Sequence, residues 1–138
     1  MLKASCLPPF LKTYQSFQEV LADRQLAALG DAYVNFAFSL ALSGRKGKPE
    51  GKKVKGSILA EAIRKAELRK MLPSRIDKHA LSDAAEALVV YAWLNNLLTL
   101  KESVQILEDS IDLQNGFAML LVRAKELVRL SRLFEVPH

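Results

Sequence analysis

The stretch HALSDAAEALVVYAWLNNLL, residues 79–98, is apolar on most faces through its middle. Its apolar residues do not follow the period of two that marks a strand, and Ala, Leu and Glu favour helix. We predict a helix over Asp77–Leu98. Because a helix that is apolar nearly all round must be covered on most sides, this helix is expected at the centre of the domain.

A second helix of the same kind is predicted over Arg24–Leu42, and it contains the stretch LGDAYVNFAFSL at residues 29–40. Its apolar surface also requires burial, so the two helices are expected to pack against each other. Gly30, Asp31 and Asn35 interrupt the apolar run, and neither helix has the unbroken apolar length of a membrane span. We therefore expect a protein without a membrane segment.

The rest of the chain also predicts helices, because no segment shows sustained strand alternation. The predicted fold class is all-α, with about six helices in a single compact domain over residues 1–138. Phe10 and Ile111 are expected on apolar helix faces, and Tyr91 and Trp93 in the core. The four further helices are predicted from just after Pro8-Pro9 to Leu21, over residues 57–72 with Ser57 as N-cap, over Lys101–Leu113, and over Phe117–Phe134 after a break at Gly116.

The overall composition is typical of a folded globular protein, since 50% of the 138 residues are hydrophobic and 25% are charged. The net charge of +5 favours an anionic partner, with nucleic acid ahead of a membrane surface. Cys6 is the single cysteine, so neither an intramolecular disulfide nor a cysteine-based zinc cluster can form. This pattern and the lack of a long apolar segment before Pro8 predict a cytoplasmic protein without a secretory signal.

One acid stands out because Asp31 lies in an almost wholly apolar stretch. A buried carboxylate without a partner either becomes neutral or is strongly destabilising. Asp83 and Glu86 are three residues apart and share a helix face, with His79 one turn earlier on that face. If the two apolar helices pack together, Asp31, Asp83 and Glu86 can meet at one edge of the core. His79 is an accessory candidate that would orient a water or a phosphate, or is an ordinary surface residue.

Three carboxylates brought together repel one another, so a fully ionised set requires a cation between them. Oxygen ligands select Mg²⁺ or Mn²⁺ over zinc, and Mg²⁺ commonly combines a few carboxylates with waters and substrate phosphate oxygens. This chemistry suits hydrolysis of phosphodiester bonds. A metal-dependent nuclease is therefore the working hypothesis.

Two motifs resemble those of the ribonuclease III family. The stretch LGDAYVNF at Leu29–Phe36 is similar to the signature helix of the family's endonuclease domain, whose pattern is E-x-x-E-x-L-G-D-A. The stretch SDAAEALVVYAWL at Ser82–Leu94 resembles its second acidic motif, D-x-x-E-A-L-x-G-A-x-Y-L. Both motifs occur in the family's order on predicted helices.

The resemblance implies an all-α endoribonuclease domain that works as a homodimer on double-stranded RNA. It also implies that acids of both motifs bind Mg²⁺ or Mn²⁺. Carried over by position, Asp31 matches the signature aspartate, and Asp83 and Glu86 match the two acids of the second motif. All three are therefore candidate metal ligands and catalytic residues, and Glu86 matches the acid usually taken as most directly catalytic.

The chain departs from the family pattern before L-G-D, where Arg24 and Ala27 stand in place of two glutamates. One expected metal ligand is therefore absent, and three of the four metal-proximal acids remain. Ala28 replaces a bulky residue that often helps to join the dimer. The chain resembles compact members of the family, Mini-III-like or archaeal-type, that lack a C-terminal double-stranded-RNA-binding domain.

A basic segment between Ser43 and Gly56 contains six cationic residues and one acid, Glu50. Such a segment is either a solvated loop or a surface that neutralises RNA phosphates without reading sequence. Duplex RNA is recognised largely through shape, phosphates and 2′-hydroxyls, so few base-reading side chains are needed. The RNA-binding candidates are Arg45, Lys46, Lys48, Lys52, Lys53 and Lys55.

Two other classes of function remain open at this stage. In the first, the chain is a catalytically impaired ribonuclease III-like protein that binds RNA or associates with the ribosome. In the second, it is a helical interaction protein whose acids serve only caps and salt bridges. Cleavage of an RNA duplex that depends on Mg²⁺ and on Glu86 separates the nuclease from both.

Overall fold

The computed structural model describes residues 8–134 and 136, and its regular secondary structure is entirely helical within them. This confirms the predicted all-α class. The predictions for Cys6 and for the segment before Pro8 lie outside the described residues. Six α-helices and one short 3-10 helix follow in the order α1 (Phe17–Ala22), α2 (Arg24–Lys46), α3 (Gly56–Lys65), η2 (Arg69–Met71), α4 (Lys78–Leu94), α5 (Leu100–Asp109) and α6 (Leu113–Ser131).

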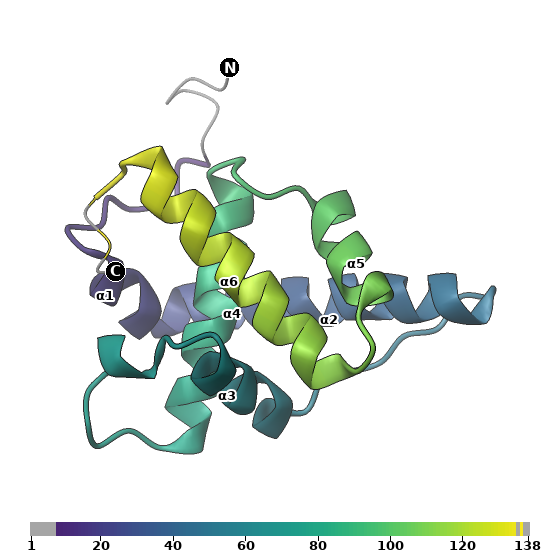
Figure 1. The fold of residues 1–138 in the computed structure, drawn as a ribbon. Coiled ribbons are helices and arrows are strands. Elements are labelled where there is room, and N and C mark those ends of the chain that lie inside the picture. Colours follow the sequence, from purple (N-terminus) through teal and green to yellow (C-terminus); the bar gives the residue numbers. More distant parts are fainter. Residues whose placement is uncertain (1–7, 135, 137–138) are drawn as a thin grey trace.

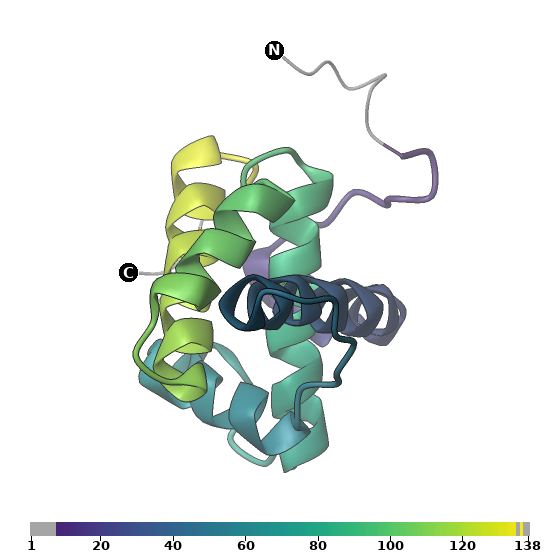
Figure 2. The ribbon, with the colours of Figure 1, turned by 90° about the vertical axis from the view of Figure 1, so that its right-hand side faces the viewer.

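Helix α4 is the centre of the molecule, as its apolar sequence predicts. It contacts α1, α2, α3 and α6, and nearly every residue from Leu81 to Leu94 is buried. In Figure 1, α2 crosses behind α4 and α6 lies across its front. Figure 2 views α2 nearly end-on where it crosses the upright α4. The described elements therefore share one hydrophobic core built around α4.

Helix α1 begins much later than the sequence analysis predicts. Ser16 is the N-cap, since its Oγ accepts a hydrogen bond from the Glu19 amide at 3.2 Å, and the Glu19 carboxylate accepts one from the Gln15 amide at 2.7 Å. These two reciprocal hydrogen bonds satisfy amide donors in the first turn and fix the N-terminal boundary of α1 at Phe17. Phe10, expected on an apolar face, is 68% exposed.

Helix α2 extends beyond the predicted end at Leu42 by another turn, to Lys46. Ser43 does not break it, because its hydroxyl bonds back to the Ser39 carbonyl at 2.8 Å. The helix ends at Gly47, which adopts the left-handed conformation at φ 72° that favours glycine. The connecting loop is therefore shorter than predicted and begins after two of the basic residues.

Helix α3 has an earlier start and an earlier end than predicted. It begins at Gly56, with Lys55 rather than Ser57 at the N-cap position and no side-chain cap. It ends because Glu67 turns to φ 60° and the Leu68 amide bonds to the Ile63 carbonyl at 3.0 Å. This closing turn places Leu68 fully inside the core, and that burial favours the turn over continued helix.

Helix α4 ends four residues before the predicted boundary at Leu98, because it is closed by a turn of the same kind as the one that ends α3. Asn96 adopts φ 60°, and the Leu97 amide bonds back to the Ala92 carbonyl at 2.9 Å. Asparagine tolerates this left-handed conformation better than most residues. The chain then reverses into Thr99, whose side chain caps α5 together with Glu102.

The break between the last two helices does not lie at Gly116. Asp112 caps α6 by accepting a hydrogen bond from the Asn115 amide, so Gly116 is buried inside the helix. Helix α5 ends at Asp109, which leaves Ile111 in the connection and 95% exposed rather than on an apolar helix face. The polar caps, rather than the glycine, decide this boundary.

By length and composition alone, α2 also passes as a membrane-spanning helix, and it is the one such candidate among the described residues. A helix buried in the core of a globular protein meets the same criteria of length and composition. The structure packs α2 against α4 and α5 and carries Asp31 and Asn35 within it, so its apolarity is accounted for by the core.

Helices α2 and α4 come close together at Gly30. A Cβ atom on residue 30 would overlap the backbone carbonyl of Glu86. The two helix backbones therefore touch at this point, which only glycine permits. This contact holds Asp31, the next residue, beside Glu86.

We expect Gly30→Ala to destabilise the fold by roughly 1–3 kcal/mol, because a clash with backbone cannot be relieved by a side-chain rotation. Chemical denaturation measures the free energy of unfolding. Gly51→Ala is the matched control: its Cβ would meet nothing within 4 Å, and we expect a change below about 1 kcal/mol. Equal effects of the two substitutions would contradict the proposed packing role of Gly30.

Candidate carboxylate site at the crossing of α2 and α4

A pocket of about 560 Å³ lies where α2 and α4 cross and where the basic loop returns to α3. It brings together the three acids that the sequence analysis selected, and His79 with them. Two cationic side chains also face it. The ionisable residues that line the pocket are Arg24, Asp31, Lys53, His79, Asp83 and Glu86.

Asp31 is held by a neighbour on its own helix. Its Oδ1 accepts a hydrogen bond from the Asn35 amide group at 3.1 Å, one turn further along α2. Asn35 Oδ1 in turn accepts a hydrogen bond from the Val54 backbone amide at 2.7 Å. Asn35 therefore orients the carboxylate and ties the basic loop to the pocket. Asn35 was predicted only as a polar interruption of the apolar run, although its i, i+4 spacing from Asp31 indicates a contact between the two side chains.

Glu86 is the most deeply placed acid, with only 6% of the residue exposed. The pKa of Glu86 is raised to about 8, mainly by burial and in addition by the hydrogen bond to Asp31 and by the charges of Asp31 and Asp83. The positive charge of Lys53 acts in the opposite direction. Near neutral pH, Glu86 therefore retains a proton unless a cation replaces that proton.

Asp83 and His79 lie further out in the same pocket. The Asp83 side chain is 20% exposed, and its Oδ2 lies 3.8 Å from His79 Nε2. The His79 side chain is 84% exposed, so it faces solvent at the rim. Asp77, one residue before α4, caps the helix by accepting a hydrogen bond from the Ala80 amide.

The acids form a pair and a third member rather than a tight triad. Across residues 8–134 and 136, no three His, Cys, Asp or Glu side chains are gathered closely enough to hold one metal ion. Asp31 and Glu86 nevertheless meet directly, and Mg²⁺ commonly binds through one or two carboxylates with waters and substrate phosphates. The Asp31–Glu86 pair fits such an ion.

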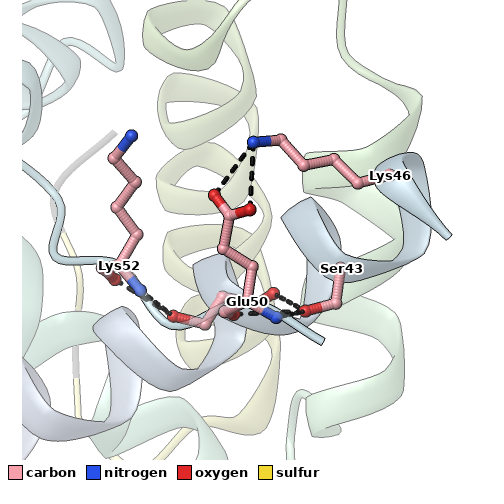
Figure 3. Close-up of polar contacts among 5 residues, drawn as sticks. Ser43, Lys46, Glu50 and Lys52 are labelled. Atoms are coloured by element: carbon pink, nitrogen blue, oxygen red, sulfur yellow. Dashed lines mark hydrogen bonds and ion pairs between the residues drawn. The ribbon is translucent and has the colours of Figure 1, made fainter. Parts of the chain in front are cut away.

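The six basic candidates fall into two groups. The Arg45 guanidinium donates to the carbonyls of Leu107, Glu108 and Ser110, so it fastens the end of α2 to the end of α5. Lys46 pairs with both carboxylate oxygens of Glu50, at 2.9 and 3.0 Å (Figure 3).

The other four cations are available to a ligand. Within the described residues, the side chains of Lys48, Lys52, Lys53 and Lys55 have no ion pair or hydrogen bond. Figure 3 shows the Lys52 side chain extending away from the loop, while its backbone contacts the Ser39 hydroxyl. The loop is thus anchored through its backbone, and its lysine side chains are left for other contacts.

An apolar patch lies on the exposed face of α2. Leu29, Tyr33 and Phe36 share one face by helical spacing, and Leu29 and Phe36 are 40% and 54% exposed. Trp93, predicted to be a core residue, is instead 41% exposed and stacks on Tyr33 with ring centroids 5.0 Å apart. Tyr91 is buried as predicted.

The helical architecture and the acid pocket at the helix crossing define the class of protein: an all-α domain with carboxylates from two helices in one pocket. The family model described as Ribonuclease III matches residues 24–133, which include every residue of this pocket. The chain belongs to the ribonuclease III family. A comparison with curated proteins gave no significant match.

In metal-free buffer, Glu86→Gln is expected to stabilise the protein more at about pH 9 than at about pH 5. Between the pKa of Glu86 in the unfolded chain, 4.5, and its pKa of about 8 in the folded state, the folded protein binds more protons at Glu86 than the unfolded chain. The stability of the wild-type protein therefore falls as pH rises through this range. Glutamine has no proton to lose and can still donate to Asp31. Thermal unfolding of both proteins in EDTA measures the difference in Tm, and a difference independent of pH would contradict the raised pKa.

Proposed function

We propose that this protein is a metal-dependent endoribonuclease that hydrolyses phosphodiester bonds in double-stranded RNA. The observation that carries the proposal is the direct meeting of Asp31 and Glu86 in a pocket that also contains Asp83 and borders a basic loop. Membership of the ribonuclease III family supports it. A cytoplasmic location, where RNA is present, accompanies this proposal.

Mg²⁺ or Mn²⁺ is the proposed cofactor, with Asp31 and Glu86 as direct ligands and Asp83 as an outer acid of the same pocket. When bound, such an ion lowers the pKa of water and offsets charge that develops on a phosphate. Asn35 keeps one Asp31 oxygen in a hydrogen bond, which fixes how the carboxylate faces the pocket. Burial of Glu86 makes its carboxylate favourable to a cation, because few waters solvate its charge.

The proposed substrate follows from the charge around the pocket. Lys48, Lys52, Lys53 and Lys55 extend from the loop that returns beside the acids, and phosphate contacts from such residues add affinity without sequence preference. Arg45 and Lys46, also candidates from the sequence, are occupied by contacts within the protein. We therefore assign the RNA-facing role to the four lysines.

Wild-type protein is expected to cleave a long RNA duplex when Mg²⁺ is present, and Glu86→Gln is expected to lower the rate by roughly a hundredfold or more. The control is Glu61→Gln, which makes the same chemical change in a surface pair with Arg64 and should leave the rate unchanged. Gel analysis of the RNA products measures the rate.

Two results would contradict the nuclease and favour another function. Salt-sensitive duplex binding without cleavage would indicate a catalytically impaired RNA-binding protein, in keeping with Ala27 at the position of an expected acid. No binding to RNA at any salt concentration would indicate a helical interaction protein.

We also propose a homodimer joined through the apolar patch formed by Leu29 and Phe36 of α2 and by Trp93 of α4, which stacks on the buried Tyr33. Exposed apolar side chains gathered on one face are typical of an interface rather than of a free surface. Ala28 and Ala32 on the same helix are exposed and small, so a second chain can approach closely.

Phe36→Glu is expected to convert the dimer to a monomer, because the dimer would bury the new charge in an apolar interface. Sedimentation measures the molecular mass, and circular dichroism checks that the fold is kept. Ile111→Glu is the control, since Ile111 is 95% exposed outside the patch and should not affect assembly. A wild-type monomer, or a Phe36→Glu dimer, would contradict this interface.

A further inference from the structure

The acid pocket contains two cations that the nuclease proposal has not used together. Arg24 begins α2, and Lys53 lies in the loop before α3; both line the pocket with Asp31, Asp83 and Glu86. Arg24 stands where the ribonuclease III pattern has a glutamate. The charge at that position is therefore reversed, and the pocket still has acids at its centre.

The two cations lie on either side of Asp31 along α2. Arg24 is two helical turns before Asp31 on the same face. Lys53 is on the other side, because the Val54 amide next to it bonds to Asn35, one turn after Asp31. A ligand that spans the pocket along α2 would therefore meet a cation, the acids and a second cation in turn.

Neither cation is neutralised by the acids it accompanies. Within residues 8–134 and 136, no ion pair or hydrogen bond involves the side chain of Arg24 or Lys53. Both residues are exposed. The Lys53 charge nevertheless reaches Glu86, since it acts on that carboxyl group. The cations are thus near the acids and free to bind an anion.

A phosphodiester is the anion that this arrangement fits. Asp31 and Asp83 repel any anion, so the cations on either side of them must supply the affinity, and an RNA backbone presents several phosphates in a row that can reach both. Arginine can grip phosphate oxygens with two parallel hydrogen bonds, and lysine acts as a point charge. With Ala27 in place of an expected acid, the pocket also has less negative charge for cations to offset.

We propose that Arg24 and Lys53 bind the RNA backbone directly across the acid pair and hold the scissile phosphodiester over Asp31 and Glu86. This inference rests on the proposed nuclease function: it adds Arg24 to the RNA-binding residues and places Lys53 at the reacting phosphate rather than on the flanking backbone. It separates Lys53, which faces the pocket, from the neighbouring Lys52, which does not line it.

The test compares single-turnover cleavage at saturating enzyme for Lys53→Ala and Lys101→Ala. Both substitutions remove one exposed positive charge, but Lys101, in the first turn of α5, does not line the pocket. Lys53→Ala is expected to lower the cleavage rate roughly a hundredfold even when the duplex is fully bound, as expected for loss of a group that stabilises charge at the reacting centre. Lys101→Ala is expected to leave that rate unchanged. Equal effects on the rate would overturn the assignment of Lys53.

Arg24→Glu tests the other cation, because it restores the acid of the family pattern. If Arg24 holds the phosphate, the substitution lowers the cleavage rate. If Arg24 merely replaced a lost metal ligand, the rate is unchanged or rises, and the proposal fails for this residue. Circular dichroism verifies the fold of each variant.

A binding measurement keeps the inference distinct from the nuclease proposal. The diribonucleotide ApU, which contains one phosphodiester, is titrated into isotopically labelled protein with Mg²⁺. We expect amide NMR shifts around Ser82 and Asp83 for wild type and for Lys101→Ala, and their loss in the Arg24→Ala/Lys53→Ala double variant. Shifts retained in the double variant would overturn the inference, whereas absence of cleavage by wild type would overturn only the nuclease function.

Discussion

The contact on which the rest of this structure depends is the one between Gly30 of α2 and the backbone of Glu86 in α4. A single methyl group at residue 30 would overlap the Glu86 carbonyl, so the two helices can cross at this distance only because residue 30 has no side chain. The crossing places Asp31 immediately beside Glu86 and buries the middle of α4 under α2. The same contact that closes the core therefore also assembles the acid pair.

That assembly has an electrostatic cost, and the proposed function depends on how this cost is offset. Two carboxyl groups that share a buried position cannot both be ionised without a counter-charge, and burial keeps a proton on Glu86 near neutral pH. A divalent cation can take the place of that proton. Lys53 and Arg24 supply positive charge from the rim of the pocket, where an RNA phosphate rather than an acid of the protein would be the partner. Acids at the centre and cations at the edge are consistent with a site for a metal ion and a polyanion together.

The regular parts of the helices followed from spacing and composition, whereas their ends mostly did not. The predicted ends failed at Leu42 and Leu98, and Gly116 proved to be inside a helix. In each case a local hydrogen bond or the burial of one residue outweighed helix propensity: the Ser43 hydroxyl bonded back to its own helix, Asn96 turned so that Leu97 could bond to Ala92, and Asp112 capped α6 before the glycine. Trp93 was predicted in the core and is instead exposed, because an apolar run does not reveal which of its side chains the neighbouring helices leave uncovered.

The sequence by itself determined that the protein is all-α, that two apolar helices form its centre, and that Asp31, Asp83 and Glu86 are the acids to examine. These features depend on residue type and on spacing within one helix, which are local properties. Only the tertiary structure decided that Asp31 and Glu86 touch while Asp83 stays further out, that Asn35 orients Asp31, and that Arg45 serves the fold while Lys53 faces the pocket. These outcomes depend on how closely α2 approaches α4 and on where the loop returns, and such distances arise from packing between segments that are far apart in the chain.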